Sequence, residues 1–94
     1  MDAPDHLNSH QRDTMAHIFR HPISHNIEWH SVLSLLNAVA TVQETHRGHY
    51  LVTIGGRSES FERPRHKDVS AEELASLRRL LRRAGYGPDG FTTA

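Results

Sequence analysis

The chain has 94 residues, no cysteine, and equal numbers of basic and acidic side chains, eleven of each. This length is enough for one small domain with a thin core, and the absence of cysteine excludes disulfides, thiolate metal sites and cysteine nucleophiles. No apolar run approaches the roughly 20 residues of a membrane span, and the first residues lack the basic and apolar stretches of a signal peptide. We therefore expect a cytoplasmic protein with no membrane partner.

Residues 1–25 are expected to form an N-terminal extension that contains one short helix. Asn8, followed three residues later by Gln11, has the spacing of a capping box, so the helix begins at Asn8 or Ser9. It runs to about Arg20, and Pro22 ends it. Its buried side consists of three apolar residues, Met15, Ile18 and Phe19.

A second helix and three strands are expected to follow. The helix runs from about Asn26 to Ala38, because one helical face carries Trp29, Val32, Leu33 and Leu36. A weakly alternating strand covers Val39–Thr45. The clearest strand is His49–Ile54, with Tyr50, Val52 and Ile54 on one side. Gly55-Gly56 predicts a hairpin turn into a third strand, Ser58–Arg63.

The last predicted element is a helix that begins after Ser70. Ser70 and Glu73 have capping-box spacing, and Gly85 suits the position just beyond the C-terminus. One face of this helix is apolar, with Leu74, Leu77, Leu81, Ala84 and the adjacent Leu80. Four arginines lie between residues 78 and 83. Residues 87–94 are expected to be a loose tail.

This order of elements predicts an α+β fold, in which a three-stranded antiparallel sheet carries its helices on one face. When the extra N-terminal helix is set aside, residues 26–86 have the α-β-β-β-α order of a double-stranded-RNA-binding-like fold. Fold alone does not give function, so the motifs must supply it.

Three motifs within residues 28–86 resemble the HicA-type toxins of bacterial toxin–antitoxin pairs. They are Gly48-His49-Tyr50 at the start of a strand, Pro64-Arg65-His66 after the third strand, and the leucine-rich helix ending in Ala84-Gly85-Tyr86. The family carries a serine between the glycine and the histidine, which this chain lacks. The family is also commonly basic, whereas this chain has a formal net charge of zero.

The resemblance implies a metal-independent endoribonuclease that cleaves mRNA, needs no cofactor and is neutralised by a HicB-like antitoxin. It implies that His49 is the general base and His66 an acid or a phosphate contact. A histidine suits this work because its pKa lies near neutrality. Phosphate clamps are expected from Arg47, Arg65 and Lys67, and an RNA-binding helix surface from Arg78, Arg79 and Arg82.

Two other function classes remain open. The first is a non-catalytic RNA-binding or protein-interaction domain on the same fold, which the neutral charge and the missing serine favour. The second is a metal-binding module, suggested by the i,i+4 histidine pairs His6–His10 and His17–His21, with His25 four residues further on. Pro22 interrupts the helix within this series. The simplest interpretation of the last helix is a solvated face whose arginines complement the helix dipole.

Overall fold

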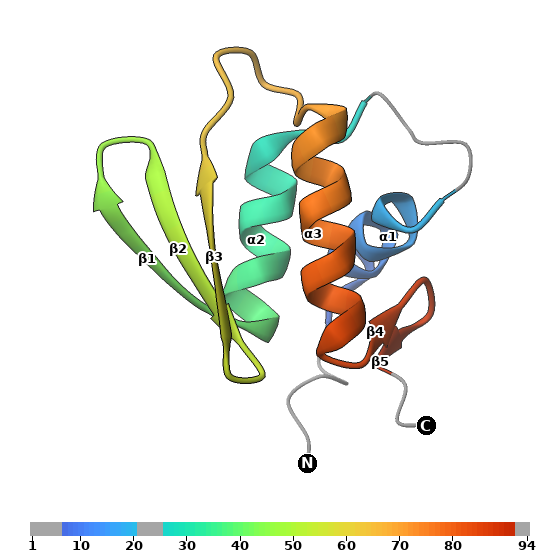
Figure 1. The fold of residues 1–94 in the computed structure, drawn as a ribbon. Helices are drawn as coiled ribbons and strands as arrows, with labels where there is room; N and C mark the ends of the chain where they lie inside the picture. Colours follow the sequence, from blue (N-terminus) through green and yellow to red (C-terminus); the bar gives the residue numbers. More distant parts are fainter. Residues whose placement is uncertain (1–6, 21–25, 92–94) are drawn as a thin grey trace.

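The computed structural model describes residues 7–20 and 26–91. Within them, the helices are α1 (Ser9–Ile18), α2 (Trp29–Val39) and α3 (Ala71–Arg83), as Figure 1 shows. The strands β1 (Thr41–His46), β2 (His49–Ile54) and β3 (Arg57–Glu62) form one sheet, and β4 (Tyr86–Gly87) pairs with β5 (Gly90–Phe91) in a small hairpin. The predicted α+β architecture is confirmed.

The sheet is antiparallel with the order β1-β2-β3, so both outer strands have a free edge within the described residues. The predicted alternation of β2 is confirmed, because Tyr50, Val52 and Ile54 are buried against the helices. The hairpin between β2 and β3 turns at Gly55 and Gly56, with φ of +58° and +81°. Both values lie in the left-handed region that glycine enters without strain.

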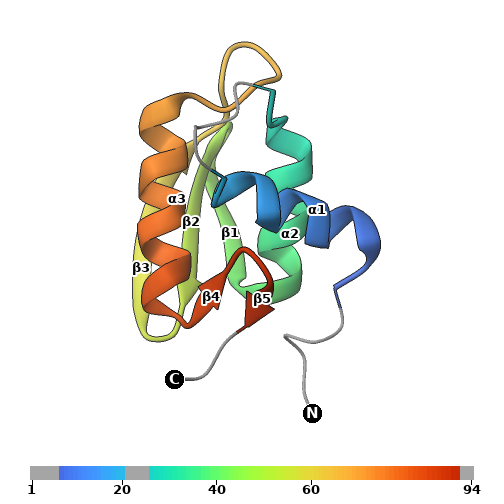
Figure 2. The same ribbon diagram turned by 90° about the vertical axis from the view of Figure 1, so that its right-hand side faces the viewer.

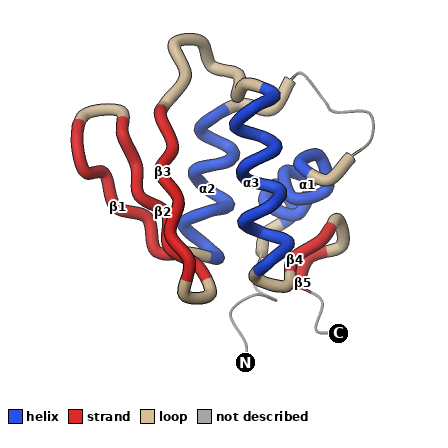
Figure 3. The backbone as a smooth tube through the Cα atoms, in the orientation of Figure 1, coloured by secondary structure: helices blue, strands red, loops and turns tan. Residues whose placement is uncertain are grey.

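The molecule is built in layers (Figure 3): α2 and α3 lie side by side, with the sheet on one side of them and α1 on the other. Figure 2, turned by 90°, shows α1 crossing the outer side of this helix pair, near the β4–β5 hairpin. The sheet's outer face is not covered by any helix of the described residues. One hydrophobic core therefore joins α1 to the α-β-β-β-α unit.

The first helix is an integral part of this core. The predicted capping box is present, since the Asn8 side chain accepts from Gln11 N at 2.7 Å and the Gln11 side chain accepts from Asn8 N at 3.0 Å. Met15, Ile18 and Phe19 are buried as predicted. The helix itself ends at Ile18, and Pro22 lies outside the described residues.

The second helix begins later than predicted, at Trp29 rather than near Asn26. The residues before it are extended and pair with the loop before α3: Trp29 N donates to Lys67 O at 2.7 Å, and Val69 N donates to Ile27 O at 2.8 Å. The helix continues to Val39, so β1 starts at Thr41 instead of Val39. The start of α2 is therefore set by pairing with residues distant in sequence, which the local periodicity of the chain does not reveal.

Three further sequence expectations need correction. Leu35, rather than Leu33, belongs to the fully buried face of α2. At α3, Ser70 caps the helix by accepting from Glu73 N at 3.2 Å, but the Glu73 carboxylate accepts from Glu62 N at 3.0 Å instead of returning to Ser70. Residues 86–91 form a hairpin, although a loose tail was expected from residue 87. A pairing between strands of two residues each is too short to read from sequence.

Candidate functional site

His49 opens β2 and faces a carboxylate on the neighbouring strand. The register pairs His49 with Glu62 across β2 and β3, and His49 Nδ1 lies 3.4 Å from Glu62 Oε2. The His49 side chain is 49% exposed, so solvent or a ligand can reach it. A carboxylate at Nδ1 orients the ring and leaves Nε2 as the nitrogen that faces outward.

The backbone of Gly48, in the turn before His49, makes two hydrogen bonds, one with a side chain and one with the backbone. Gly48 has a φ of +78°, its N–H donates to Glu44 Oε2 at 3.1 Å, and its carbonyl accepts from Arg63 N at 2.7 Å. The His46 ring stands edge-on to the His49 ring at a centroid distance of 6.1 Å. This framework holds His49 at the tip of the sheet, next to the exposed Arg47.

The loop after β3 carries the other residues predicted for this site. It leaves the sheet at the end where His49 lies (Figure 1) and contains the exposed residues Arg65, His66 and Lys67. Lys67 Nζ lies 3.5 Å from Glu28 Oε2, so it is partly engaged in an ion pair. In the described part of the chain, no polar contact involves His66, and none joins it to His49. The structure therefore brings these residues to one end without assembling two histidines into an acid–base pair.

The four arginines of α3 divide into two pairs with different surroundings. Arg78 Nε donates to Ile18 O at 3.0 Å, and the Arg82 guanidinium lies 5.6 Å from the Phe19 ring centroid. Both contacts fasten the end of α1 to α3. Arg79 and Arg83 are exposed on the side of the helix that faces β3.

These arginines do not surround His49. The first turn of α3 lies beside Glu62, the strand neighbour of His49, through the Glu73–Glu62 hydrogen bond. The other end of the helix lies beside Gly55, where a Cβ would stand 3.6 Å from Ala84 Cβ. Arg78, Arg79 and Arg82 therefore lie toward the turn between β2 and β3 at Gly55, away from His49, the predicted base.

The electrostatics at the His49 end are mixed. Burial, reinforced by the nearby Glu62 carboxylate, raises the pKa of Glu73 above its ordinary value, although the hydrogen bond from Glu62 N opposes this. Glu44 and Glu62 also lie against the turn and the histidine. The negative charge of these carboxylates repels a phosphate. Arg47 and Arg65 attract a phosphate that binds against the two loops, and so offset this repulsion there.

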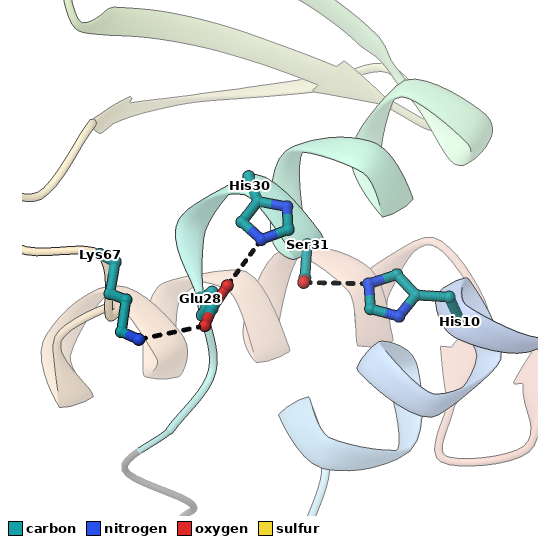
Figure 4. Close-up of polar contacts among 5 residues, drawn as sticks. All are labelled: His10, Glu28, His30, Ser31 and Lys67. Carbon is teal, nitrogen blue, oxygen red and sulfur yellow. Dashed lines mark hydrogen bonds and ion pairs between the residues drawn. The ribbon is translucent and has the colours of Figure 1, made fainter.

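A second polar cluster, which the sequence reasoning missed, lies where α1 meets the start of α2 (Figure 4). His10 Nε2 is 3.0 Å from Ser31 Oγ, and His30 Nε2 is 2.6 Å from Glu28 Oε1. The hydrogen bond with His30, followed by the charge of Lys67, lowers the pKa of Glu28 despite some desolvation. The sequence signals for this cluster are the neighbouring polar residues Glu28, His30 and Ser31 and the histidine spacing that includes His10.

The histidine series does not form a metal site in the described residues. No group of three or more His, Asp or Glu side chains there is arranged to hold a metal ion. His10 is instead hydrogen-bonded to Ser31. His10 and His17 both line a hollow of about 320 Å³ between α1 and α2. His6, His21 and His25 lie outside the described residues.

Comparison with known proteins adds no family to these observations. Protein-family models, curated proteins and solved structures all gave no match to the chain. In the ranges that the structure describes, no helix combines the length and the apolar character needed to cross a bilayer. The functional interpretation therefore depends on the geometry of the site and on the motifs.

Proposed function

We propose that the protein is a HicA-like toxin that binds mRNA and cleaves it without a metal, with His49 as the general base. The observation that carries this proposal is the pairing of an exposed histidine with a carboxylate: His49 Nδ1 lies 3.4 Å from Glu62 Oε2, while the ring remains half exposed. Catalytic histidines commonly have one ring nitrogen held by a carboxylate, which orients the ring, as Glu62 can do for His49. A HicB-like antitoxin that covers this end would block it.

The chemistry needs few groups. His49 Nε2 takes the proton of a ribose 2′-OH, which attacks the adjacent phosphorus and displaces the 5′-oxygen of the next nucleotide. Glu62 stabilises the imidazolium that forms, because it faces the other ring nitrogen. Arg47 and Arg65, exposed on the flanking loops, would stabilise the developing phosphorane charge. His66 would contact the phosphate or protonate the leaving oxygen.

A non-catalytic RNA-binding or protein-interaction domain is the second candidate. Two observations favour it: the Glu44 carboxylate lies against the turn before His49, where it would oppose a scissile phosphate, and no polar contact in the described residues connects His49 to His66. Such a domain would use the same end of the sheet for binding only.

Induced expression distinguishes these two functions. The wild type should arrest growth and fragment cellular mRNA, and His49→Ala should abolish both effects. His17→Ala is the matched control, because His17 lies on α1, on the far side of α2 and α3 from the sheet that carries His49. Arrest that is equally strong in His49→Ala would refute the catalytic role, and arrest without RNA fragments would favour the binding domain.

A further inference from the structure

A second basic surface lies at the opposite end of the sheet from His49. A hollow of about 160 Å³ opens between the start of β3 and the last turns of α3. Three arginines line it, together with one carboxylate and two uncharged residues: Arg57, Arg79, Arg83, Glu59, Ser58 and Leu80. We call Arg57, Arg79 and Arg83 the hairpin-end arginines.

The periodicities of the two elements explain why these side chains converge. Phe61 is buried beneath the helices, so Arg57 and Glu59, at even spacing from it on β3, are directed to the same side of the sheet. On α3, Arg79 and Arg83 are four residues apart and share one helical face. Because all three arginines are exposed, the core does not occupy their guanidinium groups.

None of the hairpin-end arginines is neutralised within the described residues. The ion pairs found there involve His30, His49 and Lys67, and none includes Glu59 or these arginines. Arg79 and Arg83, at i,i+4 spacing, repel each other in the free protein. Three guanidinium groups beside one carboxylate leave a net positive site, and guanidinium matches phosphate by forming paired hydrogen bonds.

We propose that the hairpin-end arginines form a second anchoring site for RNA, which holds backbone phosphates away from the cleavage site. The inference rests on the proposed RNA binding, but not on cleavage. His49 and Arg57 lie at opposite ends of the β2–β3 hairpin, because Ile54 pairs with Arg57. The five steps of β2 between His49 and Ile54 span about 17 Å at about 3.4 Å per residue. His49 and Glu62 lie on the outer face of the sheet, whereas Arg57 lies on the face of the buried Phe61. An RNA strand that reaches both sites must therefore cross the free edge of β3.

Binding of single-stranded RNA by the full chain tests this inference. The background variant His49→Ala prevents cleavage, and the probes are fluorescent oligo(U) strands. Arg57→Gln and Arg83→Gln should each weaken RNA binding about fivefold. Each should also make the slope of log K against log salt shallower, by about 0.7 for each phosphate that the variant no longer binds. Arg12→Gln is the matched control, since Arg12 is exposed on α1, beyond the helix layer. Equal affinities and slopes in all three variants would overturn the inference.

The length of the probe separates the possible outcomes. A UU dinucleotide is too short to span the two ends, so it should bind weakly. A longer strand reaches both ends, so it should bind tightly and lose more affinity in Arg57→Gln than the dinucleotide does. Full displacement of the long strand by inorganic phosphate at matched ionic strength would indicate a free-phosphate site and contradict the inference. RNA binding without any cleavage by the wild type would refute the proposed nuclease but leave this anchoring site standing. No RNA binding by the background variant or the wild type would refute both proposals.

Discussion

Replacing Arg78 with methionine should destabilise the protein, whereas the same change at the next residue should not. Arg78 Nε donates to Ile18 O at 3.0 Å, and a second guanidinium nitrogen lies 3.5 Å from Arg20 O. These carbonyls lie at the end of α1, where a helix leaves its last carbonyl groups without intrahelical partners. Arg79 is exposed and has no polar partner in the described residues.

The magnitude follows from the two contacts. A hydrogen bond from a charged donor contributes about 1.5–3 kcal/mol, but the second contact is long and Arg78 is only half-buried. We therefore expect Arg78→Met to cost about 1–2 kcal/mol, which corresponds to a Tm lower by roughly 5–15 °C for a domain of this size. Arg79→Met should remain within about 0.5 kcal/mol of the wild type.

Thermal and urea unfolding of both variants measures this difference. Trp29 is the only tryptophan and is buried against the Tyr50 ring at a centroid distance of 5.4 Å, so its fluorescence reports on the core. If Arg78→Met and Arg79→Met unfold at the same temperature, α1 is not fastened by Arg78. The assignment of Arg78 to structure rather than to RNA binding would then be wrong.

Three further predictions concern the core, a turn and a carboxylate. Leu35→Ala should cost about 2–5 kcal/mol in urea unfolding because Leu35 is fully buried, and the half-buried Leu33→Ala should cost clearly less; equal costs would contradict the corrected helix face. Gly48→Ala should lower the free energy of unfolding by about 1–2 kcal/mol, because a φ of +78° strains any residue with a Cβ. The nearest atom leaves room for that Cβ, so the strain is in the backbone alone. An unchanged Tm would refute this strain. The raised pKa of Glu73 means that the folded state holds this proton to a higher pH than the unfolded chain does, so stability should fall as pH rises from about 4.3 through the folded pKa. Glu73→Gln should flatten this decline in a pH series of urea midpoints, and an unaltered pH dependence would contradict the assignment.

Much of the fold could be predicted because its signals are local. The capping box at Asn8, the alternation of β2 and the glycine turn at Gly55 each depend on residues adjacent in sequence, and all three are confirmed. The start of α2 could not be predicted, because Trp29 pairs with Lys67 and Ile27 pairs with Val69, about 40 positions away along the chain. Pairings across such distances leave no periodic trace in the chain.

The candidate site was predictable in its composition but not in its arrangement. The motif containing Gly48 and His49 identifies an exposed histidine at the start of a strand, which the structure confirms. Its partner Glu62 follows from strand register, which depends on the hairpin turn. The division of the α3 arginines depends on α1 packing beside Arg78 and Arg82. Sequence spacing gives the helical face of each arginine, but only the packed structure shows which element covers that face.

The most direct test of the central claim is cleavage of a labelled RNA by the purified full chain in excess EDTA. We expect the wild type to cleave the strand and leave a cyclic phosphate end, His17→Ala to remain active, and His49→Ala to be slower by about 10² or more. Absence of cleavage by the wild type, or equal rates for the wild type and His49→Ala, would contradict the claim that His49 is the base of a metal-independent ribonuclease.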